Sequence, residues 1–375
     1  MSDRKIAEAF PPGDFMKEEL EARGWSQLEL AEIIGCHPKV VNDLILGRRE
    51  ISPQIAKALA QAFDTSAEYW ANLESSYQLW RAGEVDNAIA RRARLYGMAP
   101  IKEMVKRRWL EPSESVDVLE KRVKEFFRIK SLDAPVSFPH AARRGMSEIT
   151  ASQTAWLFRA RQLAHAVSAK PFSSQSFERG LRDLKTLLLS AAEARNVPRV
   201  LADAGIRFLV VEHLPQTRID GVTFWLDTKS PVIAVSLRYD RIDWFWYTLA
   251  HELGHVERRD GLQRVVTLDT DIVGEDAEPA IDDAERKAAA FATRFLLDQA
   301  KLEDFILRVR PLYSKQRIIA FAQTAGVHPG IVVGQLQFRE EILWSSCRQM
   351  LERVRDTVIQ SALTDGWGHI LPVVS

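Results

Sequence analysis

The chain has 375 residues, of which 46% are hydrophobic and 27% are charged. It is longer than one ordinary domain of about 100–150 residues, so we expect two or three folded units with a globular composition. No run of about 18 uncharged apolar residues occurs and the amino terminus lacks an apolar signal core, which argues against membrane insertion or export and predicts a cytoplasmic protein.

The formal net charge of zero conceals an uneven distribution. Residues 1–82 carry 9 basic and 13 acidic side chains, residues 83–200 carry 22 and 13, and residues 201–375 carry 20 and 25. We therefore predict three units with these boundaries. The basic middle unit either attracts an acidic partner or has solvated helical faces. Cys36 and Cys347 are far apart in the chain, so both are expected to be reduced thiols.

Short helices are predicted in residues 1–82. Ser26 and Glu29 form a capping box at a helix start. Gly35 ends that helix by adopting a positive φ, and Pro38 opens the next one, over about 38–46. Two further helices are predicted to begin at Ser52 and Thr65. Two short helices joined by a three-residue turn that contains Gly indicate a helix-turn-helix unit.

The segments 25–35 and 41–52, followed by Glu68-Tyr-Trp, resemble the Cro/repressor-like family, specifically its HigA antitoxin branch. The resemblance covers about residues 14–80. It implies that the helix from Pro38 enters the major groove of double-stranded DNA, where Lys39 and Asn42 face the bases. It also implies phosphate contacts from three side chains, Gln27, Arg48 and Arg49. Because residues 1–82 have a net charge of −4 (9 basic minus 13 acidic), useful affinity requires a homodimer or help from the basic middle unit.

Residues 83–200 are predicted to form a folded helical connector. Prolines divide this region into segments, and apolar residues such as Val118, Val123 and Phe127 recur at helical spacing. No constellation of chemically reactive residues is apparent in it.

The pattern changes after Pro198. Three short β-type runs, 206–212, 222–226 and 232–237, are separated by turn residues, and an aromatic-rich helix follows over 240–257. The predicted fold is therefore mainly α with an α+β part. It comprises a helix-turn-helix bundle, a helical connector, and a small sheet with helices.

The helix over 240–257 contains the motif His251-Glu252-Leu253-Gly254-His255. Residues four apart share one face of a helix, so His251 and His255 can direct ring nitrogens at a single ion. Two imidazoles and a carboxylate suit Zn²⁺, with another divalent ion such as Mn²⁺ as an alternative, and leave a fourth position for water. Glu252 is placed to take a proton from that water as a general base.

A third protein ligand has to come from another element. Glu285 is the first candidate because it shares a helical face with Ala288 and Ala292, whose small side chains allow a close approach to the histidine helix. Gly254 leaves room for the same approach. Asp282 and Asp283 are alternatives, and all three acidic residues could instead stabilise the helix dipole.

The segments 248–255 and 285–297 resemble the ImmA/IrrE family of bacterial metallopeptidases, and the resemblance extends over about 200–335. It implies a zincin-like domain in which His251, His255 and Glu285 hold the metal and Glu252 is the catalytic carboxylate. It also implies a repressor-like protein substrate. The sequence departs from the family at Ala289, where Asn or Asp is frequent, and at the charged segment 256–260.

Three further features are less specific. Residues 269–283 contain seven carboxylates and no basic residue, which indicates a solvated connector or a lid over the site. The spacing around Gly326 and His328 repeats that around Gly35 and His37, so we predict a second helix-turn-helix-like pair in which both histidines are turn residues. A last helix, from Glu340 to about Leu363, is expected to favour dimerisation.

The leading hypothesis is a DNA-binding regulator fused to a zinc-dependent peptidase that cleaves a repressor-like protein or its own chain. One alternative is a transcription factor whose peptidase fold senses a ligand or metal without turnover. Another is an antitoxin that neutralises a toxin partner.

Overall fold

The computed structural model describes residues 9–83, 87–133, 136, 138, 149–262, 268–270, 272 and 283–367. The chain forms two compact units, one within residues 1–89 and one within residues 90–375. Both cysteines are free thiols, as predicted. None of the helices in the described ranges has the length and apolar character that crossing a membrane requires. The three-part division by charge stays a prediction.

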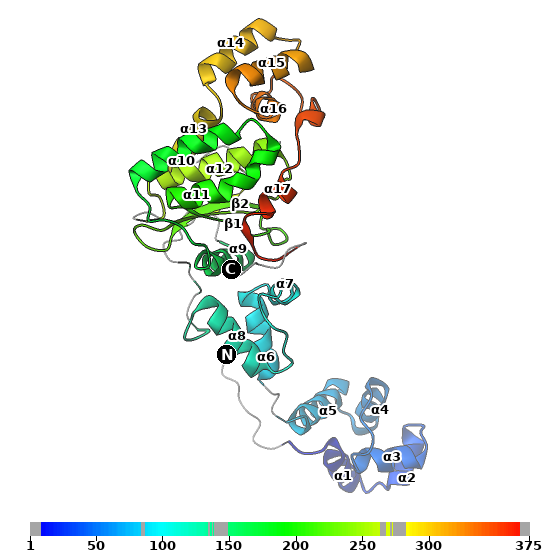
Figure 1. The fold of residues 1–375 in the computed structure, drawn as a ribbon. Helices are drawn as coiled ribbons and strands as arrows, with labels where there is room; N and C mark the ends of the chain where they lie inside the picture. Colours follow the sequence, from blue (N-terminus) through cyan, green and yellow to red (C-terminus); the bar gives the residue numbers. More distant parts are fainter. Residues whose placement is uncertain are drawn as a thin grey trace. The chain divides into compact units, whose positions relative to one another are not determined.

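The first unit consists of short helices, coloured blue in Figure 1: α1 (Pro12–Arg23), α2 (Gln27–Ile33), α3 (Pro38–Ile45), α4 (Pro53–Phe63) and α5 (Ala67–Arg81). The predicted capping box is present, because the Glu29 N–H donates to Ser26 Oγ at 3.2 Å and the Ser26 N–H donates to Glu29 Oε2 at 2.7 Å. The core of the unit includes Leu30, Val41 and Trp70, all fully buried.

The predicted cap of α5 was displaced by one residue. Ser66, and not Thr65, caps this helix by accepting from the Tyr69 N–H at 3.0 Å. Thr65 Oγ1 instead accepts a hydrogen bond from the Trp70 indole at 2.9 Å. Both residues carry a hydroxyl that can cap a helix, and the buried indole decides which of them is free to do so.

The middle region is helical, as predicted, with helices α6 (Ala88–Met98), α7 (Ile101–Lys106), α8 (Val116–Phe127) and α9 (Ala151–Ala164). The predicted apolar residues Val123 and Phe127 are buried, whereas Val118 is exposed. The buried Arg107 donates to the carbonyl oxygens of Glu212 and His213, each at 2.8 Å. These bonds fasten the connector to the segment that follows the first strand.

The sheet is mixed and has the strand order β4-β2-β3-β1-β5. Its strands are β1 (Arg207–Val210), β2 (Ile219–Trp225), β3 (Pro231–Val235), β4 (Leu268–Thr270) and β5 (Leu363–Thr364). β1 is parallel to β3 and β5, while β2 is antiparallel to β3 and β4. The three predicted β-type runs are therefore confirmed, and β4 lies at one edge of the sheet.

Helices cover both faces of this sheet (Figure 1). Phe208 and Ile233 belong to the large apolar core that also includes α10 (Ser174–Leu187), α11 (Val197–Ala204) and α12 (Ile242–Glu257). α9 covers the other face, where the Trp156 indole donates to the carbonyl oxygen of Val211 at 3.0 Å. A short 3₁₀ helix, η1 (Ala191–Asn196), links α10 to α11.

The remaining elements are α13 (Asp283–Leu296), α14 (Gln299–Val309), α15 (Lys315–Ala325), α16 (Pro329–Phe338), η2 (Arg348–Met350) and α17 (Arg355–Ile359). The predicted long helix from Glu340 to Leu363 is wrong. Only η2 and α17 are helical there, and Val354 between them is anchored because its N–H donates to Asp240 Oδ1 at 2.8 Å. Local apolar periodicity in this segment reflects burial against the core rather than a continuous helix.

α15 and α16 form the predicted second helix-turn-helix-like pair. Gly326 has a φ of 73°, close to the 67° of Gly35 in the first pair. His37 and His328 each cap the following helix through Nδ1, which accepts from the Lys39 N–H and the Gly330 N–H. The structure thus confirms that both histidines are turn residues. α16 is largely buried and contacts α12, so this pair serves as packing.

We expect Gly254→Leu to destabilise the second unit. A Cβ at position 254 would lie 3.0 Å from Ala288 Cα and 3.2 Å from Phe291 Cβ, so a larger side chain forces α12 and α13 apart. Overpacking of this kind costs about 1–3 kcal/mol. Gly97→Leu is the matched control, because Gly97 is also helical and a Cβ there meets nothing within 4 Å. Thermal unfolding in the presence of a chelator measures both variants, and equal midpoints would refute the packing argument.

Candidate metal centre

The two histidines of the motif lie on adjacent turns of α12, as predicted. His251 and His255 are buried, and their Nε2 atoms are 3.2 Å apart. α12 is enclosed by β2, β3, α13 and α16, which removes the site from bulk water. Two ring nitrogens at this distance can both bind a single metal ion.

Glu285 reaches the same point from α13. Its Oε2 lies 3.2 Å from His251 Nε2, and its Oε1 lies 3.6 Å from His255 Nε2. The close approach predicted from small residues is present, since Ala288 faces Gly254 across the contact between the helices. The alternatives are not in place: Asp283 is exposed and paired with Lys287, and Asp282 lies outside the described residues.

A fourth group, the carboxylate of Asp269 on β4, completes the cluster, and this residue was not among the ligands expected from the sequence. Its Oδ2 lies 3.4 Å from His251 Nε2 and 3.6 Å from His255 Nε2, and the residue is fully buried. Asp269 was expected to belong to a solvated connector or a lid. The prediction of a solvated connector is wrong for this residue, because Asp269 is fully buried. The available signal was the β-type run 265–268 directly before it.

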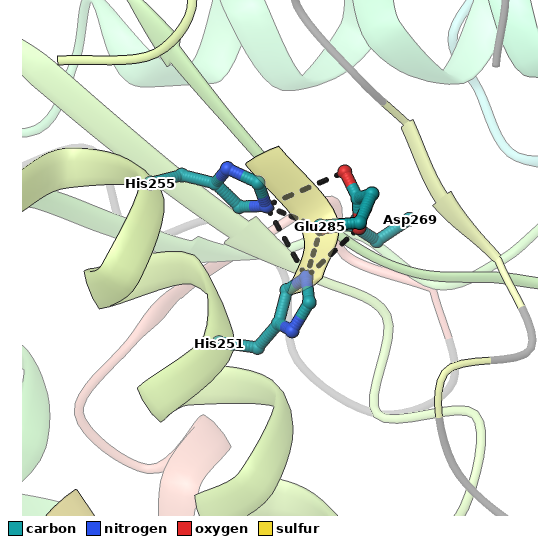
Figure 2. Close-up of side chains that lie close together, drawn as sticks. All are labelled: His251, His255, Asp269 and Glu285. Atoms are coloured by element: carbon teal, nitrogen blue, oxygen red, sulfur yellow. Dashed lines mark hydrogen bonds and ion pairs between the residues drawn. The ribbon is translucent and has the colours of Figure 1, made fainter. Parts of the chain in front are cut away.

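The four groups fit a divalent metal. His251, His255, Asp269 and Glu285 can each offer one atom such that all lie within 4.8 Å of one another, and Figure 2 shows them converging. Tetrahedral zinc with bonds of ~2.0–2.1 Å places its ligand atoms about 3.3–3.4 Å apart. The distances of 3.2, 3.2, 3.4, 3.6 and 3.6 Å between the histidine nitrogens and their neighbours are close to this edge length.

Charge supports the same conclusion. Burial raises the pKa of both Glu252 and Glu285, and the negative charge of Asp269 raises each pKa further. Burial would lower the pKa of His255, but contacts with Asp260 and Asp269 outweigh burial and raise that pKa. Without a cation, Glu252 and Glu285 therefore bind protons more readily than exposed carboxylates do, and His255 binds a proton more readily than an exposed imidazole does. A divalent ion would replace those protons, because ligands bind metal in their deprotonated forms.

Asp260 orients one of the rings. Its Oδ2 lies 3.1 Å from His255 Nδ1, the nitrogen that faces away from the cluster, and it also accepts from Arg258 Nε at 3.1 Å. A carboxylate on the distal nitrogen of a ligating histidine selects the tautomer whose other nitrogen can bind metal. The charged segment 256–260, noted above as a departure from the family pattern, thus contributes this contact.

Glu252 lies beside the cluster on the sheet side. The Thr223 hydroxyl donates to its Oε2 at 2.7 Å, whereas Oε1 has no hydrogen-bond partner among the described residues. Gly221 makes room for Oε1, because a Cβ at that position would lie 2.3 Å away from it. One carboxylate oxygen is therefore held in place and the other is free to exchange a proton.

The predicted DNA-contacting residues lie on the surface of the first unit. Lys39 is exposed on the first turn of α3, and Asn42 is half-buried one turn later. Gln27 is exposed at the start of α2, and Arg48 and Arg49 are exposed directly after α3. Their roles in DNA binding stay predictions.

Comparisons with known proteins agree with this architecture. Residues 16–70 match the helix-turn-helix family model, and residues 203–334 match a peptidase-family model described as the IrrE N-terminal-like domain. The chain therefore belongs to the helix-turn-helix transcriptional regulators through its first unit, and its second unit carries an IrrE N-terminal-like domain.

Individual relatives match the amino-terminal part. The HTH-type transcriptional regulator YbaQ of Escherichia coli is 34% identical over 98 residues, which are 26% of this chain and 84% of the relative. Antitoxin HigA-1 of Vibrio cholerae is 36% identical over 69 residues, 18% of this chain and 65% of the relative. A Pseudomonas aeruginosa protein, crystallised with its operator DNA, is 35% identical over 20% of this chain and 83% of that chain, with a TM-score of 0.20.

The ligand roles predict a clear difference between two acidic residues of α13. We expect Glu285→Gln to lower metal affinity by at least about tenfold, because an amide is a weaker ligand than a carboxylate and the change reaches the ion directly. Asp283→Asn should bind metal like the parent, since Asp283 is exposed. Chelator competition followed by elemental analysis measures both, and equal affinities would remove Glu285 from the ligand set.

Proposed function

We propose that the chain is a DNA-binding transcriptional regulator whose second unit is a zinc-dependent endopeptidase. The proposed substrate is a regulatory protein, either a repressor-like protein or the chain itself. The observation that carries the proposal is the convergence of His251, His255 and Glu285 beside the buried carboxylate of Glu252. Manganese is an alternative ion for the same donor set.

A divalent ion held by His251, His255 and Glu285 would supply Lewis acidity to a scissile carbonyl and to water. Glu252 would accept the proton of the attacking water at Oε1, while Thr223 holds Oε2. The same oxygen would then return the proton to the leaving amine. Burial raises the pKa of Glu252, which makes its carboxylate a stronger base than an exposed one. β2, which carries Thr223 and Gly221, borders the site and is paired with β3 on one side and with β4 on the other.

DNA recognition is assigned to α3. Lys39 and Asn42 would contact base edges, while Gln27, Arg48 and Arg49 would contact phosphates. The exposure of Lys39 and the arginines supports this assignment, as does the helix-turn-helix match over residues 16–70. Because residues 1–82 have a net negative charge, we propose that the chain binds double-stranded DNA as a homodimer. The proposed location is the cytoplasm.

A second candidate function is metal sensing without turnover. It is favoured by Asp269, because four protein ligands typify structural zinc sites, whereas catalytic sites keep one position open. A third candidate, neutralisation of a toxin partner, is favoured by the similarity to antitoxin HigA-1. Co-purification with a neighbouring gene product would test the third candidate.

Glu252→Gln tests the peptidase. We expect the variant to retain metal and to lose cleavage by at least about 100-fold, because a general base contributes roughly 10²–10⁴-fold. Glu257→Gln is the matched control, since Glu257 is exposed at the end of the same helix. New amino termini, mapped by mass spectrometry in the chain itself and in cells that express it, give the readout. Equal cleavage by the metal-loaded Glu252→Gln variant would exclude the peptidase mechanism.

The DNA assignment predicts two kinds of effect. Asn42→Ala should cost about 1–3 kcal/mol on a selected operator and relax the preference for one base. Arg48→Ala should weaken binding to all sequences alike and reduce the salt dependence by about one phosphate contact. Lys57→Ala, an exposed change on α4, serves as the control. Fluorescence anisotropy with operators selected from random DNA measures the affinities. Asn42→Ala and Arg48→Ala variants that bind as tightly as the parent and the control would contradict the assignment.

A further inference from the structure

The strand β4 covers the metal centre from the edge of the sheet. It pairs antiparallel with β2, with Asp269 opposite Gly221 and Thr270 opposite Ile219. Gly221 is also the residue beside which Glu252 Oε1 lies. A strand on this edge of β2 therefore passes directly over the catalytic carboxylate proposed above.

An extended peptide would use the same edge. Short peptides bind an exposed strand by adding to the sheet through backbone hydrogen bonds. The other side of β2 is already paired with β3, so only the side that β4 occupies is open to such pairing. A substrate segment aligned there would bring a backbone carbonyl to the place where the Asp269 side chain now points.

Asp269 occupies the coordination position that a catalytic zinc site keeps open for water. Its Oδ2 makes distances of 3.4 and 3.6 Å to the two histidine nitrogens, similar to those made by the Glu285 oxygens. Neither oxygen of Asp269 has a hydrogen-bond donor at ordinary length among the described residues. A fully buried carboxylate in that position is costly unless a cation compensates it.

The attachment of β4 to the sheet is limited. The strand has three residues, and its pairing with β2 is irregular between Ile219 and Gly221. Beyond the strand, the Ile272 N–H donates to Asp220 Oδ2 at 2.8 Å. Three paired residues can be exchanged for a longer competing strand at a small cost in backbone hydrogen bonds.

We propose that β4 is an internal inhibitory strand. Asp269 supplies the fourth ligand of the metal, and residues 268–270 occupy the β2 edge on which an extended polypeptide substrate pairs. The resting site is closed, and cleavage requires β4 to leave that edge. The inference rests on the proposed peptidase function, which it extends by naming the substrate-binding edge and the group that blocks the metal.

Cobalt substitution tests the coordination without relying on activity. The probe is acetohydroxamate, a small chelating ligand that binds an open metal position and changes the visible spectrum of Co²⁺. We expect Asp269→Ala to bind acetohydroxamate at least about tenfold more tightly than the parent, because one protein ligand is removed. Asp269→Asn keeps the shape of the side chain and should change in the same direction. Asp283→Ala, which removes an exposed carboxylate, should behave like the parent.

Hydrogen exchange tests the strand. Removal of the metal by a chelator should speed exchange of the amides of β4 in the parent, because Asp269 then loses its bond to the ion, while the amides of β3 stay protected. The same treatment should have little effect on β4 in Asp269→Ala. If the β4 amides of the parent exchange at the same rate with and without metal, the proposal is overturned.

The outcomes separate the two hypotheses. Equal hydroxamate affinity of the parent and both Asp269 variants overturns the inhibitory strand, and the peptidase is then still judged by Glu252→Gln. Tighter hydroxamate binding together with faster cleavage of fluorescent casein by Asp269→Ala supports both hypotheses. Tighter binding without any cleavage supports closure by Asp269 and counts against the peptidase.

Discussion

The contact between α12 and α13 is the constraint on which the site depends. Gly254 and Ala288 let the two helix backbones approach so closely that a Cβ at position 254 would lie 3.0 Å from Ala288 Cα. That approach carries Glu285 to His251 and His255, since the three residues lie on the faces that meet. A larger residue at position 254 would collide with Ala288 and Phe291 and push α13, which carries Glu285, away from the imidazoles.

The electrostatics of the centre follow from this packing. Burial raises the pKa of Glu252 and Glu285, whereas the two histidines outweigh burial at Asp269 and lower the pKa of that carboxyl. A divalent cation relieves this imbalance better than protons, because it interacts with several carboxylates at once. In the proposed mechanism, metal occupancy and the docking of β4 are linked through Asp269. The proposed inhibitory strand would keep the site closed until a competing strand displaces β4.

The helix-turn-helix pattern occurs twice in the chain with different consequences. In the first unit α3 presents Lys39 to solvent, and Arg48 and Arg49 are exposed just after the helix ends. In the second unit α16 is buried against α12, so the same kind of turn places a helix that packs against the one carrying His251 and His255. Residue spacing alone therefore predicts the helix-turn-helix motif but not whether its second helix is exposed or buried. Burial depends on what packs against the helix.

The sequence alone determined the elements whose signals are local. These include the capping box at Ser26, the β-type runs, and the i, i+4 spacing that places His251 and His255 on one face. It also predicted Glu285, because small residues on one helical face permit close packing. Only the tertiary structure brought in Asp269 and Asp260 and replaced the expected carboxy-terminal helix by separate short elements. Those features arise from contacts between segments distant in the chain, such as β4 on β2 and Val354 on Asp240, and a local pattern such as the β-type run 265–268 cannot specify which partner a segment contacts.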